Sequence, residues 1–199
     1  MVERQLRRRG IADERVLNAM ATVPRERFVT PRDHGRAYRD GALAIGSGQT
    51  ISQPWIVAAM AQALELRGDE LVLEVGTGSG YSAAVLSLLC REVVTIERHV
   101  ALADQAAALL RELGYGNVQV RAGDGTLGVP DRAPFEGITV TATAEGAAPQ
   151  ALLSQLAPRG TLVGPVRRAE GEHLVRIRDG REESLAAVRF VPLVSGEDE

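Results

Sequence analysis

Residues 71–80 read Leu-Val-Leu-Glu-Val-Gly-Thr-Gly-Ser-Gly, and the rest of the chain is best interpreted outward from them. The apolar run 71–75 has the length and composition of a short buried strand. Glycines follow at 76, 78 and 80, and a glycine-rich backbone turns sharply and lets a ligand approach closely. Because a helix is expected over 80–90, the segment predicts a strand, a tight turn and a helix in succession.

Strand-like and helix-like patterns alternate after this segment. Four further strands are expected, at 92–96, 118–120, 138–141 and 161–163. The helices between them carry apolar residues at helical spacing, namely Leu102, Ala106, Leu109 and Leu113 before Gly114, and Leu152, Leu153 and Leu156. Before the segment, a helix begins at Pro54 and ends at Gly68. This alternation predicts an α/β fold with a doubly wound, mostly parallel, Rossmann-like sheet and helices on both faces.

The two ends of the chain depart from the alternating pattern. Residues 1–40 read as a helical extension, and 41–53 as a glycine-rich connector. Strands at 173–178 and 185–191 meet at Asp179-Gly180, a dipeptide typical of hairpins, so we expect an antiparallel edge on a sheet of about seven strands. We interpret residues 1–199 as one domain, made of an N-terminal part (1–53), a βαβ core (54–166) and a C-terminal hairpin (167–199).

Composition excludes several classes of protein. The 199 residues are 45% hydrophobic and carry a net charge of −3, which disfavours a nucleic-acid partner. No apolar run reaches the roughly 18–20 residues of a membrane span, and the first residues lack the apolar core of a secretory signal. Cys90 is the single cysteine, and the three histidines are not at metal-ligand spacing. We expect a cytoplasmic protein with no membrane, nucleic-acid or metal partner.

The glycine spacing and Glu74 indicate which ligand the turn would bind. Dinucleotide-binding turns carry G-x-G-x-x-G, whereas this chain has G-x-G-x-G over 76–80. An acid at the strand end would repel a pyrophosphate but suits a cation such as the ammonium of a methionyl group. The pattern favours S-adenosylmethionine over a nicotinamide dinucleotide, with a glycine turn that binds nothing as the alternative.

Two further acids follow the next two strands. Glu97 ends the second strand, where a carboxylate can accept hydrogen bonds from both ribose hydroxyls; the alternative is an exposed strand-end acid. Asp124, after the third strand, is placed to accept a hydrogen bond from an adenine amino group; the alternative is a simple Asp-Gly turn. Since parallel strands end at the same edge of a sheet, the three acids predict one site.

Several segments outside the glycine turn are also distinctive. They are 9–11 (Arg-Gly-Ile), 23–26 (Val-Pro-Arg-Glu), 37–38 (Ala-Tyr), 48–54 (Gly-Gln-Thr-Ile-Ser-Gln-Pro), 123–125 (Gly-Asp-Gly) and 190–193 (Phe-Val-Pro-Leu). With residues 73–80, they make the chain resemble the protein-L-isoaspartate O-methyltransferase family, the protein repair methyltransferases, over about residues 2–194. Residues 73–80 are shared by many methyltransferases, whereas 48–54 is far more specific to this family.

The resemblance implies an enzyme that transfers a methyl group from S-adenosylmethionine to the free carboxylate of L-isoaspartyl residues in damaged proteins and peptides, leaving S-adenosylhomocysteine. Ser52 matches the family's active-site serine. The cofactor-binding residues would be Thr50, Ile51, Glu74, Gly76, Thr77, Gly78, Gly80, Glu97, Arg98, Asp124 and Gly125. Gln49, Gln53 and Trp55 would belong to the substrate loop, and we expect a monomer.

This reaction fits the residues present. A carboxylate has a pKa near 4 and is ionised at neutral pH, so it needs no general base, and no Ser-His-Asp set is evident. Catalysis then depends on in-line placement of the carboxylate and the methyl group and on the exclusion of water. Ser52 would orient the carboxylate by a hydrogen bond; the alternative is that Ser52 caps the helix that begins at Pro54.

Some positions depart from the family's usual pattern. Ala44 and Ser47 stand where Pro and His are common, Trp55 replaces a frequent Tyr, and Arg167 stands where Gly is common. The segment 142–146 also diverges. These differences leave open a methyltransferase with a different acceptor, such as a small molecule or a modified peptide, and a protein that binds S-adenosylmethionine without catalysis. Trp55 would either cover the active site or pack in the core.

Overall fold

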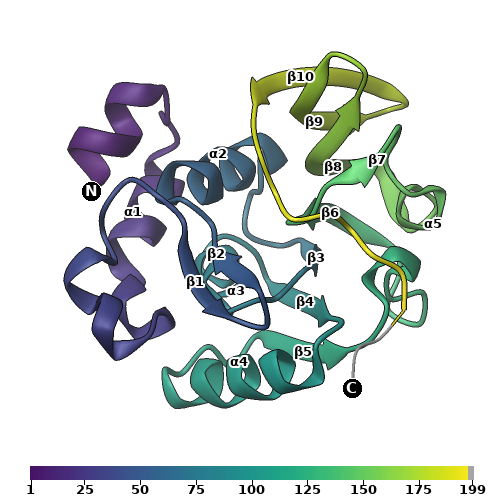
Figure 1. Cartoon of the computed structure of the whole chain (residues 1–199). Coiled ribbons are helices and arrows are strands. Elements are labelled where there is room, and N and C mark those ends of the chain that lie inside the picture. The colour runs from purple at the N-terminus through teal and green to yellow at the C-terminus, as the bar shows by residue number, and fades with distance from the viewer. Residues whose placement is uncertain (197–199) are drawn as a thin grey trace.

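The computed structural model describes residues 1–196, and a mostly parallel sheet lies at its centre (Figure 1). The sheet has the order β10-β9-β8-β6-β3-β4-β5, and β7 pairs with β8 beside this path. Its strands are β3 (Leu71–Val75), β4 (Glu92–Glu97), β5 (Val118–Ala122), β6 (Phe135–Val140), β7 (Ala144–Glu145), β8 (Leu156–Arg168), β9 (Gly171–Arg178) and β10 (Arg181–Ala187). Strands β3, β4, β5, β6 and β8 are parallel, whereas β9 and β10 are antiparallel. The predicted α/β class and the antiparallel edge are confirmed.

Helices cover both faces of the sheet. The helices are α1 (Glu14–Thr22), α2 (Pro54–Leu64), α3 (Tyr81–Ser87), α4 (Val100–Glu112) and α5 (Gln150–Leu153). Side chains of a strand alternate between the two faces. Val72 therefore packs with residues of α1, α2 and α3, whereas Leu73 packs with Leu152 of α5 on the opposite face. Figure 1 shows α1 and α2 on one side of the sheet and α5 on the other.

The N-terminal extension is helical, as predicted, but in short pieces. A π-helical turn at Val2–Leu6 and 3₁₀ helices at Arg7–Arg9, Arg25–Phe28 and Pro31–Arg36 flank α1. Asp13 caps α1, because its side chain accepts hydrogen bonds from the main-chain N–H groups of Arg15 and Val16. Among the described residues, none of the helices combines the length and the apolar character that a membrane crossing requires.

The predicted connector 41–53 contains a hairpin instead of irregular chain. Strands β1 (Leu43–Gly46) and β2 (Gln49–Ile51) pair antiparallel across Ser47 and Gly48, whose φ angles are 47° and 68°. Positive φ at both central residues is the geometry of a tight two-residue hairpin turn. The prediction was wrong because only a short apolar run flanks this turn, which gives little strand periodicity.

Several predicted boundaries also shift. Helix α2 ends at Leu64, not Gly68, because Glu65 takes a left-handed φ of 54° and its carboxylate pairs with the guanidinium groups of Arg176 and Arg178. Leu156 has helical spacing from Leu152 but pairs with Phe135 at the start of β8. The second hairpin strand begins at Arg181 and ends at Ala187, so residues 188–191 lie beyond it.

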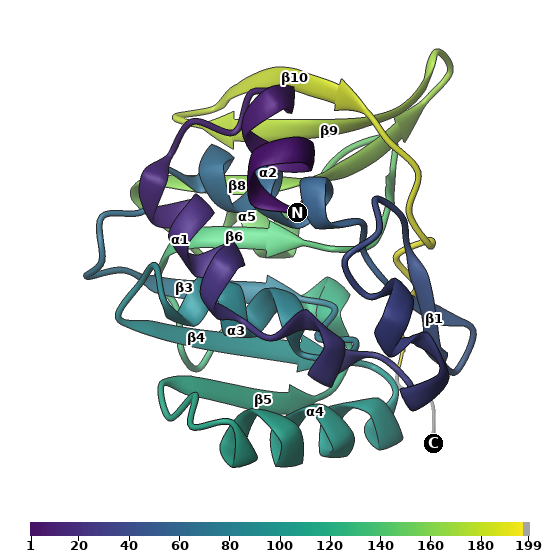
Figure 2. The same ribbon diagram turned by 90° about the vertical axis from the view of Figure 1, so that its left-hand side faces the viewer.

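The strand order reverses at β3, and this reversal positions the site. From β3 the chain adds β4 and β5 on one side and then β6 and β8 on the other. In such a sheet, ligands bind beyond the carboxyl ends of the strands at the reversal. Figure 2 shows the parallel strands pointing toward the side of the molecule where the β1–β2 hairpin lies.

Substitutions in α4 test the packing of this layer. The sequence pattern placed Leu109 on the apolar face, but the structure buries Leu110 to 2% exposure and packs its side chain against Gly80. We expect Leu110→Ala to lower the free energy of unfolding by about 2–5 kcal/mol, and Leu109→Ala to cost clearly less. Urea unfolding of both variants measures this, and equal losses would contradict the described packing.

Candidate active site

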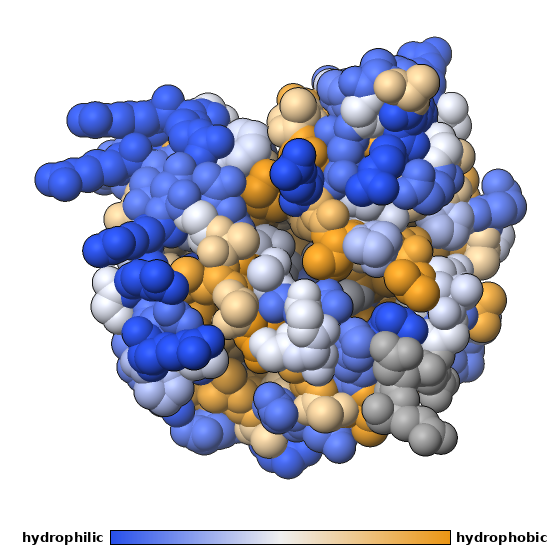
Figure 3. Space-filling view, viewed as in Figure 1, coloured by the Kyte–Doolittle hydropathy of each residue, from blue (hydrophilic) through white to orange (hydrophobic). Residues whose placement is uncertain are grey.

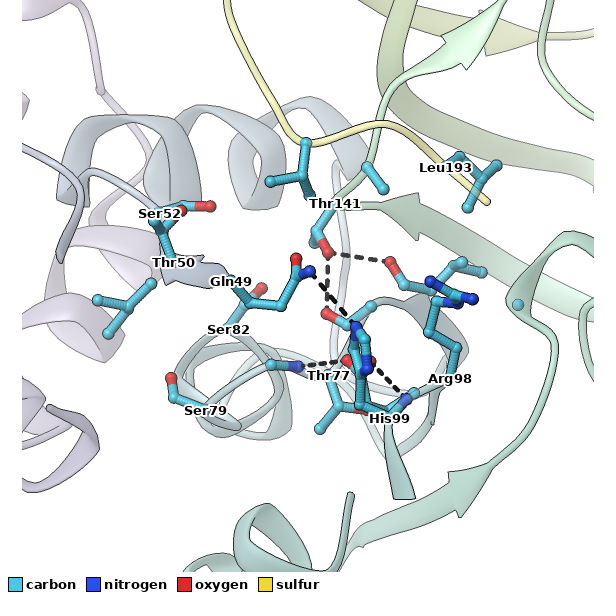
Figure 4. Close-up of a pocket in the computed structure, with 18 of the residues that line it drawn as sticks. Gln49, Thr50, Ser52, Thr77, Ser79, Ser82, Arg98, His99, Thr141 and Leu193 are labelled. Carbon is cyan, nitrogen blue, oxygen red and sulfur yellow. Dashed lines mark hydrogen bonds between the residues drawn. The ribbon is translucent and has the colours of Figure 1, made fainter. Parts of the chain in front are cut away.

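A cavity of about 280 Å³ lies over the carboxyl ends of the central strands. Five segments form most of its wall: 48–52 of the β1–β2 hairpin, 75–79 after β3, 96–99 after β4, 141–142 after β6, and 191–194 near the C-terminus. The remaining lining residues are Val57, Met60, Tyr81, Ser82 and Gly125. Figure 3 shows this face of the molecule hollowed at its centre, with hydrophobic side chains gathered around the hollow. Figure 4 shows Ser52 at one end of the cavity and Arg98 and His99 at the other.

Two glycines let the backbone itself form part of the wall. Gly76 has a φ of 95°, and a Cβ there would lie 2.2 Å from Thr141 Oγ1. The Thr141 hydroxyl instead lies 2.8 Å from the carbonyl oxygen of Gly76, which ties the turn after β3 to the end of β6. A Cβ at Gly125 would lie 2.6 Å from Val75 Cγ1. Side chains are excluded at both positions, so a ligand there meets the main chain.

Glu97 is held in a fixed orientation at the wall. Its side chain accepts hydrogen bonds from the main-chain N–H of Gly78 at 2.9 Å and of His99 at 3.1 Å. The residue is only 6% exposed. A carboxylate has about four lone-pair positions, so each oxygen keeps capacity to accept a further hydrogen bond from a ligand hydroxyl.

Glu74 does not line the cavity, contrary to the expectation that it meets a cationic group of the cofactor. It is fully buried, on the face of the sheet that carries α3, and its Oε2 accepts a hydrogen bond from Thr95 Oγ1 at 2.8 Å. Thr95 in turn lies 2.7 Å from the hydroxyl of Thr77, which does line the cavity. Glu74 therefore reaches the cavity through these two threonines and through Ser82, whose side chain hydrogen-bonds to it and lines the cavity. Burial raises the pKa of the Glu74 carboxyl to about 7.

Asp124 and Gly80 also lie outside the wall. Asp124 Oδ1 accepts hydrogen bonds from the main-chain N–H and the hydroxyl of Thr126, and Oδ2 accepts one from the main-chain N–H of Gly196. The side chain thus caps a 3₁₀ turn and ties the C-terminal segment to it, which matches the turn alternative. Gly80 lies at the start of α3 with a φ of 86°, packed against α4.

The hairpin residues divide between the cavity and an adjoining groove of about 400 Å³. Gln49 and Ile51 line the cavity, whereas Gln53 and Trp55 line the groove. The Trp55 ring lies in that groove under the Arg9 guanidinium, whose Cζ is 4.4 Å from the ring centroid. Trp55 therefore does not line the cavity, and its partly buried ring packs against the edge of the core.

Ser52 lies where the cavity and the groove meet. Ser52, Thr50, Thr141 and Val191 line both hollows. Gln53 occupies the cap position of α2, and no side chain caps that helix, so the alternative role of Ser52 as a cap is not seen. Within the described residues, the Ser52 hydroxyl has no hydrogen-bond partner, which leaves it able to bind a ligand.

Three parts of the wall were missed from the sequence. Thr141 is the last residue of the predicted fourth strand, so its position at a strand end was the available signal. Residues 191–194 form a wall because the main chain of Thr143 bonds to Val191 O and Leu193 N, at 2.7 and 2.8 Å. Tyr81 and Ser82, at the start of α3, face the cavity with no sequence signal beyond the glycine turn.

The comparisons with known proteins identify the family. A family model described as protein-L-isoaspartate(D-aspartate) O-methyltransferase matches residues 1–198. The chain belongs to this family. A protein-L-isoaspartate O-methyltransferase of Roseiflexus castenholzii is 54% identical over 193 residues, which cover 95% of this chain and 88% of the relative. A second from Rhodopseudomonas palustris is 54% identical over 203 residues, covering 99% and 82%.

Solved structures of the family share the fold. One protein-L-isoaspartate O-methyltransferase superposes with a TM-score of 0.82 and 28% identity, covering 96% of this chain and 65% of that one. A putative member from Plasmodium falciparum, solved with S-adenosyl-L-homocysteine, gives a TM-score of 0.80 at 24% identity, covering 94% of each chain. The doubly wound sheet with its C-terminal hairpin is therefore the fold of the isoaspartate O-methyltransferases.

Glu74→Gln tests the buried carboxyl. Native Glu74 holds its proton up to a pKa of about 7, whereas the unfolded carboxyl loses it near 4.5. Between these values the native state binds more protons, so the free energy of unfolding falls as the pH rises, by about 3 kcal/mol in total. We expect Glu74→Gln to remove this loss, so that its stability relative to wild type is higher at pH 8 than at pH 4.5. Urea unfolding at both pH values measures the difference, and an unchanged difference would contradict the assignment.

Proposed function

We propose that this chain methylates the free carboxylate of L-isoaspartyl residues in damaged proteins and peptides, with S-adenosylmethionine as the methyl donor and Ser52 as the residue that orients the acceptor. The reaction is that of the family to which the chain belongs. The observation that carries the residue assignment is the position of Ser52, with a free hydroxyl, where the cavity and the groove meet.

The cavity residues fit the cofactor. Gly76 and Gly125 line the cavity with main chain, and Glu97 keeps lone pairs for the ribose hydroxyls. Thr50, Ile51, Thr77, Gly78 and Arg98 would complete the contacts. When bound, S-adenosylmethionine supplies a sulfonium methyl group that an anionic oxygen can attack.

The groove suits the acceptor. An isoaspartyl residue is part of a peptide, so its carboxylate must reach the cavity while the chain on either side stays outside. The groove runs from Gln53 and Trp55 past residues 187–191, and it opens into the cavity at Ser52. A peptide in the groove would direct its carboxylate to the Ser52 hydroxyl.

The residues at this junction would position the acceptor carboxylate. The acceptor carboxylate is ionised at neutral pH, so no proton has to be removed. The Ser52 hydroxyl donates a hydrogen bond that fixes the carboxylate, and orientation of this kind can supply up to roughly 7–11 kcal/mol of rate enhancement. Ile51, Val57 and Val191 present apolar surface that keeps water from the attacking oxygen. The proposal also includes a cytoplasmic monomer, and the single cysteine agrees with a reducing compartment.

A pair of peptides tests the activity. Methyl transfer should proceed on an isoaspartyl peptide and not on the same sequence with an ordinary aspartyl residue, because only in the first is the free carboxylate bonded directly to Cα, with the main chain lengthened by a methylene group. Radiolabelled methyl incorporation measures both. Equal rates on the two peptides, or none on either, would refute the proposed substrate and favour another acceptor or binding without catalysis.

Ser52→Ala tests the orienting hydrogen bond. We expect kcat/KM for the isoaspartyl peptide to fall about 100-fold, since correct placement supplies much of the rate. Affinity for S-adenosylhomocysteine should change less than about threefold, because cofactor contacts remain. Ser184→Ala, an exposed serine on β10, is the matched control. Unchanged turnover in Ser52→Ala would remove the role assigned to this residue.

A further inference from the structure

Arg25 is the largest charged side chain that is wholly buried. It lies in the 3₁₀ helix Arg25–Phe28 and is 0% exposed. Its Nε donates to the carbonyl oxygen of Ala37 at 2.8 Å, and Nη2 donates to the carbonyl oxygen of Ser52 at 2.7 Å. Its Cζ lies 4.6 Å from the centroid of the Tyr81 ring. One side chain thus joins the N-terminal extension, the Ser52 loop and the start of α3.

Among residues 1–196, the charge of Arg25 has no counter-ion. Its partners there are two neutral carbonyl groups and the neutral side chain of Tyr81, and the buried Nη1 has no hydrogen-bond partner by geometry. The neighbouring Glu26 carboxylate is engaged by the Tyr38 hydroxyl instead. An unpaired buried cation costs several kcal/mol, and an apolar residue would fill the same space without that cost. The arrangement therefore keeps a positive charge at some expense to stability.

The position of this charge relates it to the acceptor. Both Ser52 and Tyr81, which Arg25 contacts, line the cavity, so the guanidinium lies directly behind that part of the wall. The Glu97 carboxylate lies in another part, against Gly78 and His99. A positive group, Arg25, therefore lies behind the wall beside Ser52. A negative group, Glu97, lies in the wall where the ribose would bind.

We infer that Arg25 is a positioning residue that selects an anionic acceptor: its buried, uncompensated charge attracts the substrate carboxylate to Ser52 while its hydrogen bond holds the Ser52 main chain in place. This inference rests on the proposed function. A buried charge is poorly screened, so its attraction persists across the short distance through the wall. A neutral amide at the same place gains the hydrogen bond but not the attraction.

Other arginines near the junction act differently. Arg9 and Arg189 line the groove, but Arg189 is exposed and Arg9 pairs with Asp40 at 3.0 Å. Their attraction for an anion is screened by salt, whereas that of Arg25 is not. Measurements in about 0.5 M salt therefore isolate the buried charge.

The test compares two peptides that differ only in charge. One carries isoaspartate and the other isoasparagine, its uncharged amide, and dissociation constants are measured by calorimetry with S-adenosylhomocysteine bound. In high salt, the wild-type chain should bind the carboxylate about tenfold more tightly than the amide. Arg25→Gln should bring this ratio close to one while amide affinity changes less than about threefold. Arg25→Lys should keep most of the ratio but lower kcat, because a lysine keeps the charge and loses the fixed geometry.

Arg15→Gln is the matched control. Arg15 likewise donates to two carbonyl oxygens, of Leu66 and Leu89, both at 2.7 Å, but lies away from the cavity. This variant should keep the wild-type ratio, and thermal unfolding reports whether any variant has failed to fold. The inference is overturned if Arg25→Gln weakens both peptides equally, as a purely structural brace would, or if the wild-type chain does not prefer the carboxylate. If the isoaspartyl peptide is methylated but binds no more tightly than its amide, only the inference about Arg25 is overturned. If the isoaspartyl peptide is not methylated, the proposed function and the inference are both overturned.

Discussion

The close approach of Thr141 to Gly76 is the constraint on which the site depends. It joins the carboxyl ends of β3 and β6, the two neighbouring strands between which the chain order reverses. Only a residue without a side chain allows the hydroxyl to reach that carbonyl. The turn it fixes presents Gly78 N–H to Glu97, so the Glu97 end of the cavity is set by the same contact. The parallel sheet brings the strand ends together, and the contact between Thr141 and Gly76 fixes the turn after β3 that lines the cavity.

Charge is distributed unevenly around that edge. Glu97 is oriented by two main-chain N–H groups, Glu74 is sealed behind the threonines, and Arg25 lies behind Ser52. The reaction brings a cationic methyl donor and an anionic acceptor together. This environment stabilises the acceptor when it lies near Arg25 and the donor when it lies at the end of the cavity away from Arg25. The three groups come from different parts of the chain. The fold alone places Glu97 in the wall of the cavity and the other two behind it.

The fold was largely predictable, because long buried strands and amphipathic helices leave clear periodicity. Strand β3 and the start of α2 at Pro54 were predicted to the residue. The β1–β2 hairpin was not, since its identity rests on two positive φ angles at Ser47 and Gly48. The end of α2 was also missed, because ion pairs between Glu65 and a distant strand decide it.

The site was predictable where it follows strand ends and less so elsewhere. Glu97, Gly76 and Gly125 line the cavity because parallel strands end at one edge. Asp124 and Glu74 obey the same rule, yet one is engaged by the C-terminal segment and the other faces the interior of the protein. Neither contact can be predicted from the residues next to these acids in the sequence. Arg25 belongs to the distinctive segment 23–26, but one sequence alone does not indicate that its side chain is buried.

Residues 191–194 are a wall of the cavity, although the strands that carry the glycine turn and Glu97 were completed about half a chain earlier. A polypeptide emerging from the ribosome therefore cannot finish its binding pocket until residues 191–194 have been synthesised. Ligand binding then reports on the integrity of this late segment, and a chain cut short before Val191 would lack that wall even with its sheet intact.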